Sequence, residues 1–391
     1  PYVYTKEHIG RHLMKKWLSL MLAVLCCLHL CCPAVHAADP LGISAQAYVL
    51  MEADTGKVLL SKNGDEKRPI ASTTKIMTTL LCLESGGLDD WFVVDPEAIR
   101  VEGSSMGLQE GDVVTKRMLC YGMLLPSGND AANATAVRLA GSIPEFAKLM
   151  NARAARIGMT HTCFVTPSGL DAEGHGASAR DMGLLARTAM QNPDFRAICS
   201  QSRAEVCFGN PPYNRWLKNT NKLLTMYEGV VGIKTGFTDA AGRCLVSFCE
   251  RDGVSLLCVT LHAKDDWNDH MKLYDYGFAH VVSQPVEPPD ALSVSVVGGT
   301  ADTVALRTRD PLSVGTDNGD LRQLTVQVQV EPFLYAPVPE NARVGNLAYY
   351  YEGRHVADVP LYTVDAVAAQ EQEPETPGFW QALLARIRSW F

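Results

Sequence analysis

The sequence predicts an α+β protein, and three features of the 391-residue chain support that prediction. A segment around residue 75 carries the start and stop signals of a helix. Three apolar runs between residues 230 and 261 are separated by turn residues, as in a meander of antiparallel strands. Beyond a proline-rich break at residues 285–289, short alternating segments predict a small β-rich region.

The predicted helix opens at Ser72, shortly after Pro69, and Gly86-Gly87 closes it. Ser72 and Lys75 are spaced i and i+3, so they share one face of that helix. We therefore expect the serine hydroxyl and the lysine amine to come within hydrogen-bond reach at the helix N-terminus. The apolar residues of this segment are Ile76, Met77, Leu80, Leu81 and Leu83.

The predicted meander begins with a strand at Val230–Ile233, which leads into Lys234-Thr235-Gly236. A second run, Cys244–Cys249, turns at Arg251-Asp252-Gly253 into a third, Val254–Leu261. These runs predict neighbouring antiparallel strands, because the connection between the second and third is short.

Residues 285–366 are predicted to form a separate β-rich domain without catalytic residues, following a catalytic domain at residues 38–284. A turn at Glu352-Gly353 separates the last two of four predicted strands. Such a domain suits either spacing an active site from a membrane or contacting partners, and the sequence leaves both open. The four strands are Leu292–Val297, Leu324–Val330, Leu347–Tyr351 and Val356–Leu361.

Three short motifs occur in a fixed order: Ser72-x-x-Lys75, Ser127-Gly128-Asn129 and Lys234-Thr235-Gly236. Each alone has an ordinary explanation, because serine caps helices, Ser-Gly-Asn suits a turn and Lys-Thr-Gly can end a strand. A chain of this length should contain about one Ser-x-x-Lys by chance, whereas all three motifs in this order have a chance expectation of roughly one per cent. Together they predict a serine acyl-transfer site.

Ser72 is the predicted nucleophile of that site, and it needs a base to remove its proton. Lys75 can act as that base once burial or a nearby cation such as Lys234 lowers its pKa and leaves it neutral. Ser127 would then relay protons between Lys75 and the leaving amine.

The other motif residues are expected to hold the substrate. Asn129 would bind the substrate backbone, and Lys234 would add a fixed positive charge. Gly236 has no side chain, so a substrate backbone can lie along this strand as an added strand. The backbone N–H groups of Ser72 and Phe237 would form the oxyanion hole.

With these motifs in view, the chain resembles the low-molecular-mass, penicillin-binding D-alanyl-D-alanine carboxypeptidases. The resemblance covers roughly residues 43 to 280 strongly and continues more weakly to about residue 365. It rests on segments around the motifs and outside them. These segments are Glu52–Leu59, Leu125–Asn133, Ser178–Asp181, Asn219–Leu224 and Ala241–Leu245.

The resemblance implies an antiparallel sheet flanked by helices, a helical lobe and an active site between them. It implies that Ser72 forms the acyl-enzyme, Lys75 accepts its proton, Ser127 completes the site and Lys234 binds substrate. The implied substrate is a peptidoglycan stem peptide ending in D-Ala-D-Ala, β-lactam antibiotics are the implied covalent inhibitors, and no metal or organic cofactor is required.

One position departs from the family pattern. Some relatives carry an arginine, thought to hold the terminal carboxylate of the substrate, where this chain has Thr220. Thr235 and Lys234 are the remaining candidates for that contact.

Three other functions stay open at this point. A β-lactamase shares the first and third motifs, but this chain lacks the Glu-x-x-Leu-Asn segment in which class A enzymes often carry their deacylating glutamate. A D,D-endopeptidase would use the same residues on a cross-linked peptide. A non-catalytic cell-wall binding module is disfavoured, because binding alone does not need Ser72, Lys75 and Ser127 together.

Residues 1–37 are predicted to be an upstream extension and a signal peptide. Met14 is followed by Lys15-Lys16, an apolar run from Trp17 to Cys32, and Val35-His36-Ala37 as a cleavage signal. The sequence therefore predicts an exported, extracytoplasmic protein.

The rest of the composition excludes some functions. With a net charge of −8 and no basic stripe, the chain is a poor nucleic-acid binder. Most of the cysteines beyond the signal peptide are expected to be buried thiols without metal-ligand spacing, and Cys199 with Cys207 is the one pair to check as a disulfide. His175 is predicted to be a loop residue near the site rather than a catalytic base.

The C-terminal end is predicted to bind a membrane. Residues 367–377 form a linker, and residues 378–391 form an amphipathic helix whose apolar side chains fall within an arc of roughly 140° at ~100° per residue. The segment is too short to span a bilayer. A helix lying in the membrane interface is favoured over a helix docked on the protein. The apolar residues are Phe379, Trp380, Leu383, Leu384, Ile387, Trp390 and Phe391.

Overall fold

The computed structural model of the protein describes residues 41–371 and 379–389. The predicted signal peptide, residues 1–37, lies outside these ranges, as do residues 372–377 of the predicted linker. In the described ranges, no helix combines the length and the apolar character needed to cross a membrane.

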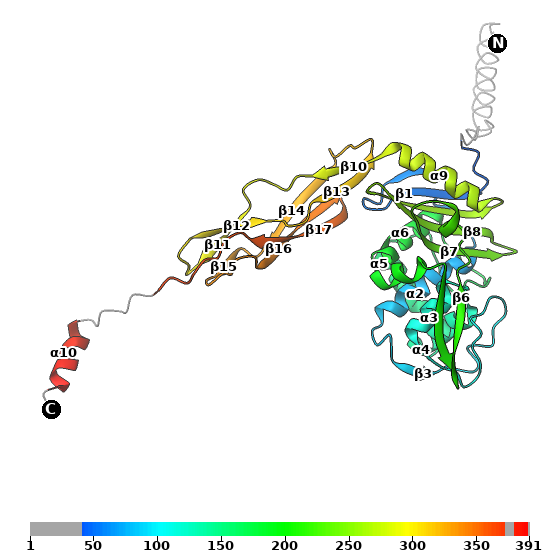
Figure 1. Ribbon diagram of the computed structural model, residues 1–391, viewed down its shortest axis with the longest axis horizontal. Helices are drawn as coiled ribbons and strands as arrows, with labels where there is room; N and C mark the ends of the chain where they lie inside the picture. The colour runs from blue at the N-terminus through cyan, green and yellow to red at the C-terminus, as the bar shows by residue number, and fades with distance from the viewer. Residues whose placement is uncertain (1–40, 372–378, 390–391) are drawn as a thin grey trace, which may run out of the picture. The chain divides into compact units, whose positions relative to one another are not determined.

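A five-stranded antiparallel sheet forms the centre of the catalytic part (Figure 1). Its strands are β1 Ala47–Glu52, β2 Val58–Lys62, β7 Val230–Thr238, β8 Gly242–Arg251 and β9 Val254–Ala263. The order β2-β1-β9-β8-β7 confirms the predicted meander. Asp252 and Gly253 form its tight turn with positive φ angles of 50° and 76°. The N-terminal strand β1 completes the sheet by pairing with β9, so that Val49 lies opposite Val259.

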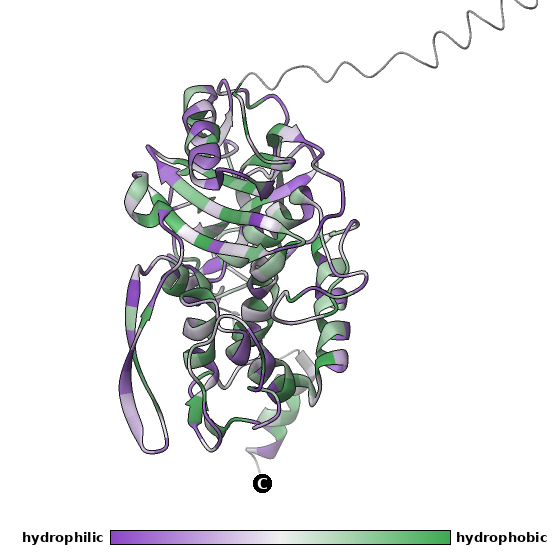
Figure 2. Ribbon diagram, turned by 90° about the vertical axis from the view of Figure 1, so that its right-hand side faces the viewer, coloured by the Kyte–Doolittle hydropathy of each residue, from purple (hydrophilic) through white to green (hydrophobic). Residues whose placement is uncertain are grey.

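Helices cover both faces of this sheet. The helices of this part are α2 Lys75–Glu84, α3 Lys116–Leu124, α4 Asn129–Ala140, α5 Ile143–Ile157, α6 Ala179–Met190, α7 Pro193–Cys199, α8 Leu223–Met226 and α9 Asp266–His280. Gly183 of α6 lies against Met51, whereas Gly277 of α9 lies against Leu50. Neighbouring strand residues point to opposite faces, so α6 and α9 cover opposite sides. Hydrophobic stretches run through the strands and the helices beside them (Figure 2).

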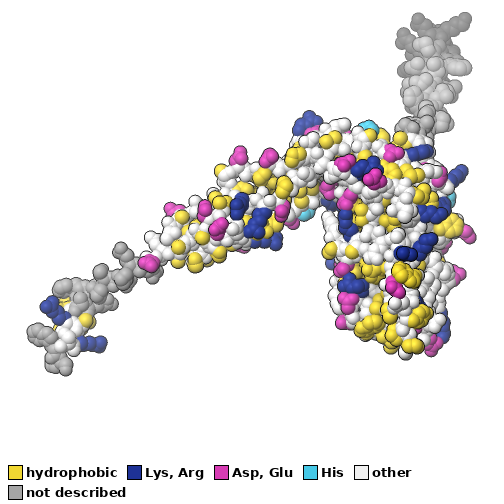
Figure 3. Space-filling model, viewed as in Figure 1, with side chains coloured by type: hydrophobic (Ala, Val, Ile, Leu, Met, Phe, Trp, Pro, Cys, Tyr) yellow, Lys and Arg dark blue, Asp and Glu magenta, His cyan; other side chains and the backbone are white. Residues whose placement is uncertain are grey.

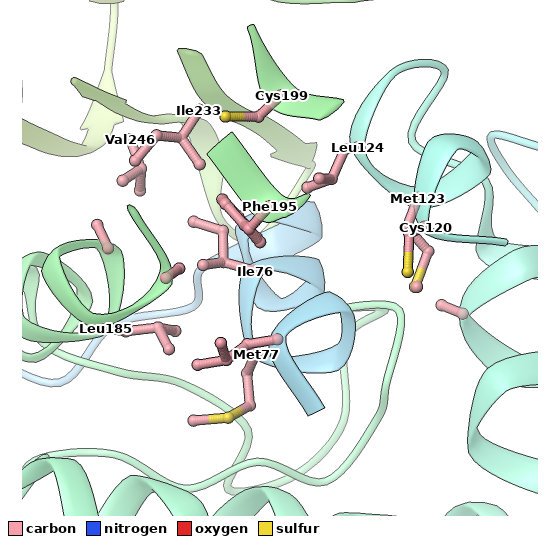
Figure 4. Close-up of a cluster of buried hydrophobic side chains, with 14 of the residues drawn as sticks. Ile76, Met77, Cys120, Met123, Leu124, Leu185, Phe195, Cys199, Ile233 and Val246 are labelled. Atoms are coloured by element: carbon pink, nitrogen blue, oxygen red, sulfur yellow. The ribbon is translucent and has the colours of Figure 1, made fainter. Parts of the chain in front are cut away.

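Helix α2 lies in the middle of the helical part. Only Leu81 and Glu84 of this helix are more than slightly exposed, and a helix that is buried on nearly all sides has little freedom to shift. Its residues Ile76 and Met77 contact a cluster that joins the other helices to the sheet (Figure 4). The start of α2 is therefore a rigid place for reactive side chains.

The predicted helix is confirmed from Lys75 onward and differs at its first turn. Residues Ala71–Thr74 form a 3-10 turn, and the α-helix begins only at Lys75. Ala71 has a φ of 47°, and both the amide and the hydroxyl of Thr73 donate to the Ile70 carbonyl, at 3.2 and 2.6 Å. This tight turn competes with α-helical hydrogen bonding, which sequence periodicity does not reveal.

Two small two-stranded sheets of the catalytic part were not predicted. Strand β3 (Trp91–Val93) pairs with β4 (Val113–Thr115), and β5 (Arg203–Gly209) pairs with β6 (Pro212–Lys218). Strands β3 and β4 have three residues each, so hydrophobic periodicity marks them weakly. Strand β5 does alternate, with Ala204, Val206 and Phe208 buried, and this signal was overlooked.

The C-terminal part is β-rich, as predicted. Its strands are β10 Val281–Val286, β11 Ser293–Val297, β12 Thr303–Arg307, β13 Leu312–Asp317, β14 Leu324–Val330, β15 Phe333–Tyr335, β16 Arg343–Tyr351 and β17 Arg354–Thr363. Six of them form a sheet in the order β14-β16-β17-β12-β11-β15, while β10 pairs with β13. A separate small core, including Leu347 and Leu361, fills one face of the larger sheet. All four predicted strands are present, and Glu352 and Gly353 form the predicted turn with positive φ angles.

The predictions for the cysteines and for the C-terminal helix can also be compared with the structure. All eight cysteines in the described residues are free thiols; Cys199 is buried and Cys207 is exposed, so they form no disulfide. Residues Phe379–Arg388 form helix α10, which confirms a helix at this position. Its Trp380, Leu384 and Ile387 side chains are exposed.

We expect Leu185→Ala to lower the free energy of unfolding by about 2–5 kcal/mol, because Leu185 is fully buried in the cluster of Figure 4 and truncation leaves a cavity. Leu149→Ala is the matched control, since Leu149 is 44% exposed, and should cost less than about 1 kcal/mol. Urea unfolding of both variants measures the difference. Equal losses would mean that the cluster does not support the helical part.

Candidate active site

Ser72 and Lys75 meet at the junction of the 3-10 turn and α2. The Lys75 Nζ atom lies 2.9 Å from the Ser72 Oγ atom. Ser72 is half-buried, whereas Lys75 has no exposed surface. The predicted pair is therefore formed, with the nucleophile accessible and the base enclosed.

The surroundings of Lys75 decide its protonation. Besides Ser72, its Nζ atom contacts the Asn129 Oδ1 atom at 2.7 Å and the Ser168 carbonyl oxygen at 2.6 Å. These two oxygens can only accept hydrogen bonds, whereas a serine hydroxyl can also donate one. A neutral amine that donates to Asn129 and Ser168 thus keeps its lone pair for the Ser72 proton.

Burial is the main cause that lowers the pKa of Lys75 well below its usual value, and the charge of Lys234 adds to it. Both effects disfavour the ammonium form. The structure therefore supports the predicted neutral base.

The second motif lies in the connection between α3 and α4. Ser127 has a φ of 67°, an uncommon conformation for a residue with a side chain, and Asn129 is the first residue of α4. Ser127 lines the same cleft as Ser72. Asn129 is only 4% exposed, and its Nδ2 atom donates to the Glu102 carbonyl at 2.7 Å. Asn129 thus holds Lys75 in place through Oδ1, and its Nδ2 atom keeps a second hydrogen for the predicted substrate contact.

The third motif runs along β7 at the edge of the sheet. Lys234 is buried, and burial lowers its pKa to about 7. Lys234 therefore gives up its proton more readily than a lysine in water, and a nearby anion would favour its charged form. Thr235 forms a 2.6 Å hydrogen bond between its hydroxyl and that of Thr220. Thr220, the position of the family departure, thus lies beside the candidate carboxylate site.

Gly236 is explained by close contact with the nucleophile turn. A Cβ atom at this position would lie 3.1 Å from the backbone nitrogens of Ser72 and Thr73 and 3.0 Å from the Ile70 carbonyl oxygen. Any other residue would press on the turn that carries Ser72. The next residue, Phe237, has a side chain that is 64% exposed beside the cleft.

One or two residues of each motif border a cleft of about 370 Å³: Ser72, Ser127, Thr235 and Gly236. Sequence reasoning missed Arg243, although it lies in a segment that carries the family resemblance. Arg243 directly follows the β7–β8 turn opposite Phe237, and two of its nitrogens contact the Asp266 carboxylate at 2.8 and 2.7 Å. The cleft is lined by Ser72, Ser104, Ser127, Thr220, Lys222, Thr235, Gly236, Phe237, Arg243, Asp266 and Trp267.

His175 lies in a loop next to the site. Its Nδ1 atom accepts from the Val165 amide at 3.0 Å, so its proton is on Nε2, which contacts the Thr74 hydroxyl at 2.9 Å. Burial lowers the pKa of His175 to about 4. The residue therefore supports the nucleophile turn as a neutral loop side chain. Among the described residues, no cluster of His, Cys, Asp or Glu could hold a metal.

In this site a buried lysine is hydrogen-bonded to a serine at the start of a helix, and an antiparallel edge strand lies beside them. This arrangement defines a serine acyl-transferase with a lysine base. The comparisons with known proteins agree. A sequence model of the D-alanyl-D-alanine carboxypeptidase family matches residues 34–265, and one of the C-terminal domain of penicillin-binding protein 5 matches residues 284–369. The chain belongs to the D-alanyl-D-alanine carboxypeptidase family, a family of serine-type hydrolases.

Individual relatives match over most of their length. The chain is 34% identical to the D-alanyl-D-alanine carboxypeptidase DacC of Escherichia coli, over 89% of this chain and 90% of the relative. It is 30% identical to DacF of Bacillus subtilis, over 88% and 90%.

Solved structures support the same fold. Penicillin-binding protein 5 of Haemophilus influenzae is 26% identical with a TM-score of 0.61, covering 83% of this chain and 98% of that one. The Streptomyces K15 DD-transpeptidase is 31% identical with a TM-score of 0.58, covering 61% and 98%.

Proposed function

We propose that this carboxypeptidase removes the terminal D-Ala from peptidoglycan stem pentapeptides through an acyl-enzyme on Ser72. The observation that carries the proposal is the set of partners around the Lys75 amine. Asn129 and Ser168 take two of its hydrogens, so the lone pair faces the Ser72 hydroxyl.

In the first step the Ser72 oxygen attacks the carbonyl carbon of the penultimate D-Ala, and its proton passes to Lys75. The negative charge that develops on the carbonyl oxygen is held by the backbone N–H groups of Ser72 and Phe237. The C–N bond then breaks, and the leaving amine takes a proton delivered through Ser127. D-Ala departs, and the shortened peptide stays on Ser72 as an ester. Water hydrolyses that ester with Lys75 again as base.

The terminal carboxylate of the substrate requires cations. Arg243 and Lys222 line the cleft, and the buried Lys234 lies next to it, where its Nζ atom donates to the Thr235 carbonyl oxygen at 2.9 Å. We assign the carboxylate to Lys234 and Arg243. A bound carboxylate would stabilise the ammonium form of Lys234 and raise its pKa from about 7. The Arg243 guanidinium can bind a carboxylate through two N–H groups, and Asp266 holds it in one orientation. Arg243 thus supplies a cation that Thr220 does not.

The protein would work outside the cytoplasm, attached to the outer face of the cell membrane. The sequence pattern of residues 1–37 supports export. Helix α10 supports attachment, because its Trp380, Leu384 and Ile387 side chains are exposed near Arg386 and Arg388.

Labelled penicillin should attach covalently to the peptide that contains Ser72, and Ser72→Ala should show no adduct.

Lys75→Arg should slow acylation by about 10²- to 10⁴-fold, because a guanidinium cannot be deprotonated at working pH. Lys148→Arg, on the exposed surface of α5, is the control and should acylate at the wild-type rate. An adduct in Ser72→Ala, or full-rate acylation of Lys75→Arg, would contradict the mechanism.

The same purified protein distinguishes the reaction classes. Release of D-Ala from a soluble pentapeptide should greatly exceed both nitrocefin hydrolysis and cleavage of a cross-linked dimer. Fast dimer cleavage would instead favour a D,D-endopeptidase, and fast nitrocefin turnover without D-Ala release a β-lactamase.

Arg243→Gln should reduce the preference for penicillin over its methyl ester by about 10- to 100-fold, the value of one charge-assisted hydrogen bond. The readout is the ratio of the two acylation rates, which a general loss of stability does not change. The single variant leaves the buried Asp266 carboxylate without its partner. The double variant Arg243→Gln/Asp266→Asn removes that carboxylate and should show the same reduced ratio as Arg243→Gln. Arg322→Gln, at an exposed arginine, is the control and should keep the wild-type ratio. An unchanged ratio in both cleft variants would remove Arg243 from the carboxylate site.

Truncation after Pro377 should move the mature protein from the membrane fraction to the soluble fraction and leave D-Ala release unchanged, because apolar burial by α10 supplies the attachment. Ser389→Ala in the full chain is the control. A truncated protein that still sediments with membranes would show that another segment binds them.

A further inference from the structure

A second cleft lies on the catalytic part, away from the motif residues. It has a volume of about 550 Å³ and separates strand β5 from β3 and the start of α3. Figure 1 places β3 and β6 at the same end of this part, and Figure 3 shows hydrophobic side chains gathered there. We call it the hairpin cleft, after the β5–β6 hairpin that forms one wall.

Two tryptophans line the hairpin cleft from opposite walls. Trp91 of β3 is 58% exposed and Trp216 of β6 is 62% exposed. Indole rings usually bury most of their surface, and exposed aromatic groups around a cavity mark binding sites. The guanidinium of Arg203 lies over the Trp216 ring, 5.1 Å from its centroid, and holds this ring in place.

The polar groups between the tryptophans are also held in position. Arg117 binds both oxygens of Asp89 at 2.8 and 3.0 Å, and Glu205 accepts from Asn214 at 2.8 Å. Arg203 is exposed and has no ion pair among the described residues, so most of its five N–H donors remain for a ligand. The lining has two arginines and two carboxylates, and Arg117 also pairs with Asp194 at 2.8 Å, so the cleft offers no excess positive charge to an anion. A neutral ligand with many hydroxyl groups fits this arrangement better than an ion does.

We propose that the hairpin cleft binds an N-acetylated amino sugar of a glycan strand. The flat faces of pyranose rings carry C–H groups that stack on the Trp91 and Trp216 indoles. The hydroxyls of the sugar exchange hydrogen bonds with Arg203 and Asp89. Met118 and Val206 line the same cleft and supply apolar surface for the acetamido methyl group. The inference rests on the proposed function, because the stem peptides of that reaction are attached to such strands.

The position of the cleft indicates which strand it holds. Trp216 and Thr220 are four residues apart, so their Cα atoms are at most about 14 Å from each other. Thr220 borders the active-site cleft at Thr235, on the side proposed for the terminal carboxylate. The stem that is being cut extends away from that side. The sugar in the hairpin cleft therefore belongs to a neighbouring strand, which keeps the enzyme on the wall between turnovers and raises the local concentration of further stems.

A peptide-free tetramer of β-1,4-linked N-acetylglucosamine tests the proposal on the purified full chain. Cys207 is exposed and lines the hairpin cleft, whereas Cys163 is part-buried elsewhere. The tetramer should bind saturably and slow maleimide labelling of Cys207 but not of Cys163. Trp91→Ala/Trp216→Ala should weaken binding by about tenfold or more, as expected for a lost aromatic anchor. Tyr335→Ala, a 72% exposed aromatic of the β-rich part, is the matched control and should bind as the wild type does.

A second measurement uses the natural polymer. In the double tryptophan variant, the ratio of D-Ala release from isolated cell walls to release from soluble pentapeptide should fall about tenfold. The absence of tetramer binding by the wild type, equal binding by the tryptophan variant or an unchanged ratio would overturn the sugar site. Protection of Cys207 by a free peptide but not by the tetramer would also overturn it, since the free edge of β5 would then hold a peptide. Penicillin labelling of Ser72 reports separately on the proposed reaction.

Discussion

The burial of the Lys75 amine is the constraint on which the rest of the site depends. A lysine in water is charged and useless as a base, whereas this one is enclosed by α2, the start of α4 and the loop that carries Ser168. Each of those elements must be rigid, because a shift of about 1 Å would admit water or lose an acceptor. This explains why so polar a site is surrounded by a large apolar core. The core fixes α2, the start of α4 and the Ser168 loop relative to one another.

On the sheet side, close packing also fixes the position of the site. Gly236 approaches the backbone of Ser72 so closely that β7 and the nucleophile turn form one packed unit. On the helical side, the buried Asp130 accepts hydrogen bonds from the amides of Met106, Gly107 and Leu108 and so fixes the loop that follows Ser104. Neither contact involves a reacting atom. Both restrict the width of the cleft, which explains why the motif residues are accompanied by residues without chemical roles.

Much of this could be predicted from the sequence, because the relevant signals are local. The meander follows from apolar runs and the turn at Arg251-Asp252-Gly253, and the Ser72–Lys75 contact follows from i, i+3 spacing. Long-range features could not be predicted in this way. The pairing of β1 with β9, the hold of Asn129 on Lys75 and the entry of Arg243 into the cleft depend on segments that are distant in sequence. The lowered pKa of Lys234 could not be predicted for the same reason, since its cause is burial by the whole fold.

The pairing of β1 with β9 also determines when the site can exist. More than 200 residues separate Val49 from its partner Val259, so the sheet closes only after nearly the whole catalytic part is present. Such non-local pairing forms slowly, because the entropy of closing a long loop is lost before the contacts between the strands stabilise the sheet. Strand β7 is held in the sheet by β8, and β8 by β9. The nucleophile turn therefore gains its last neighbour late in folding, and a partly made chain carries Ser72 and Lys75 without yet being an enzyme.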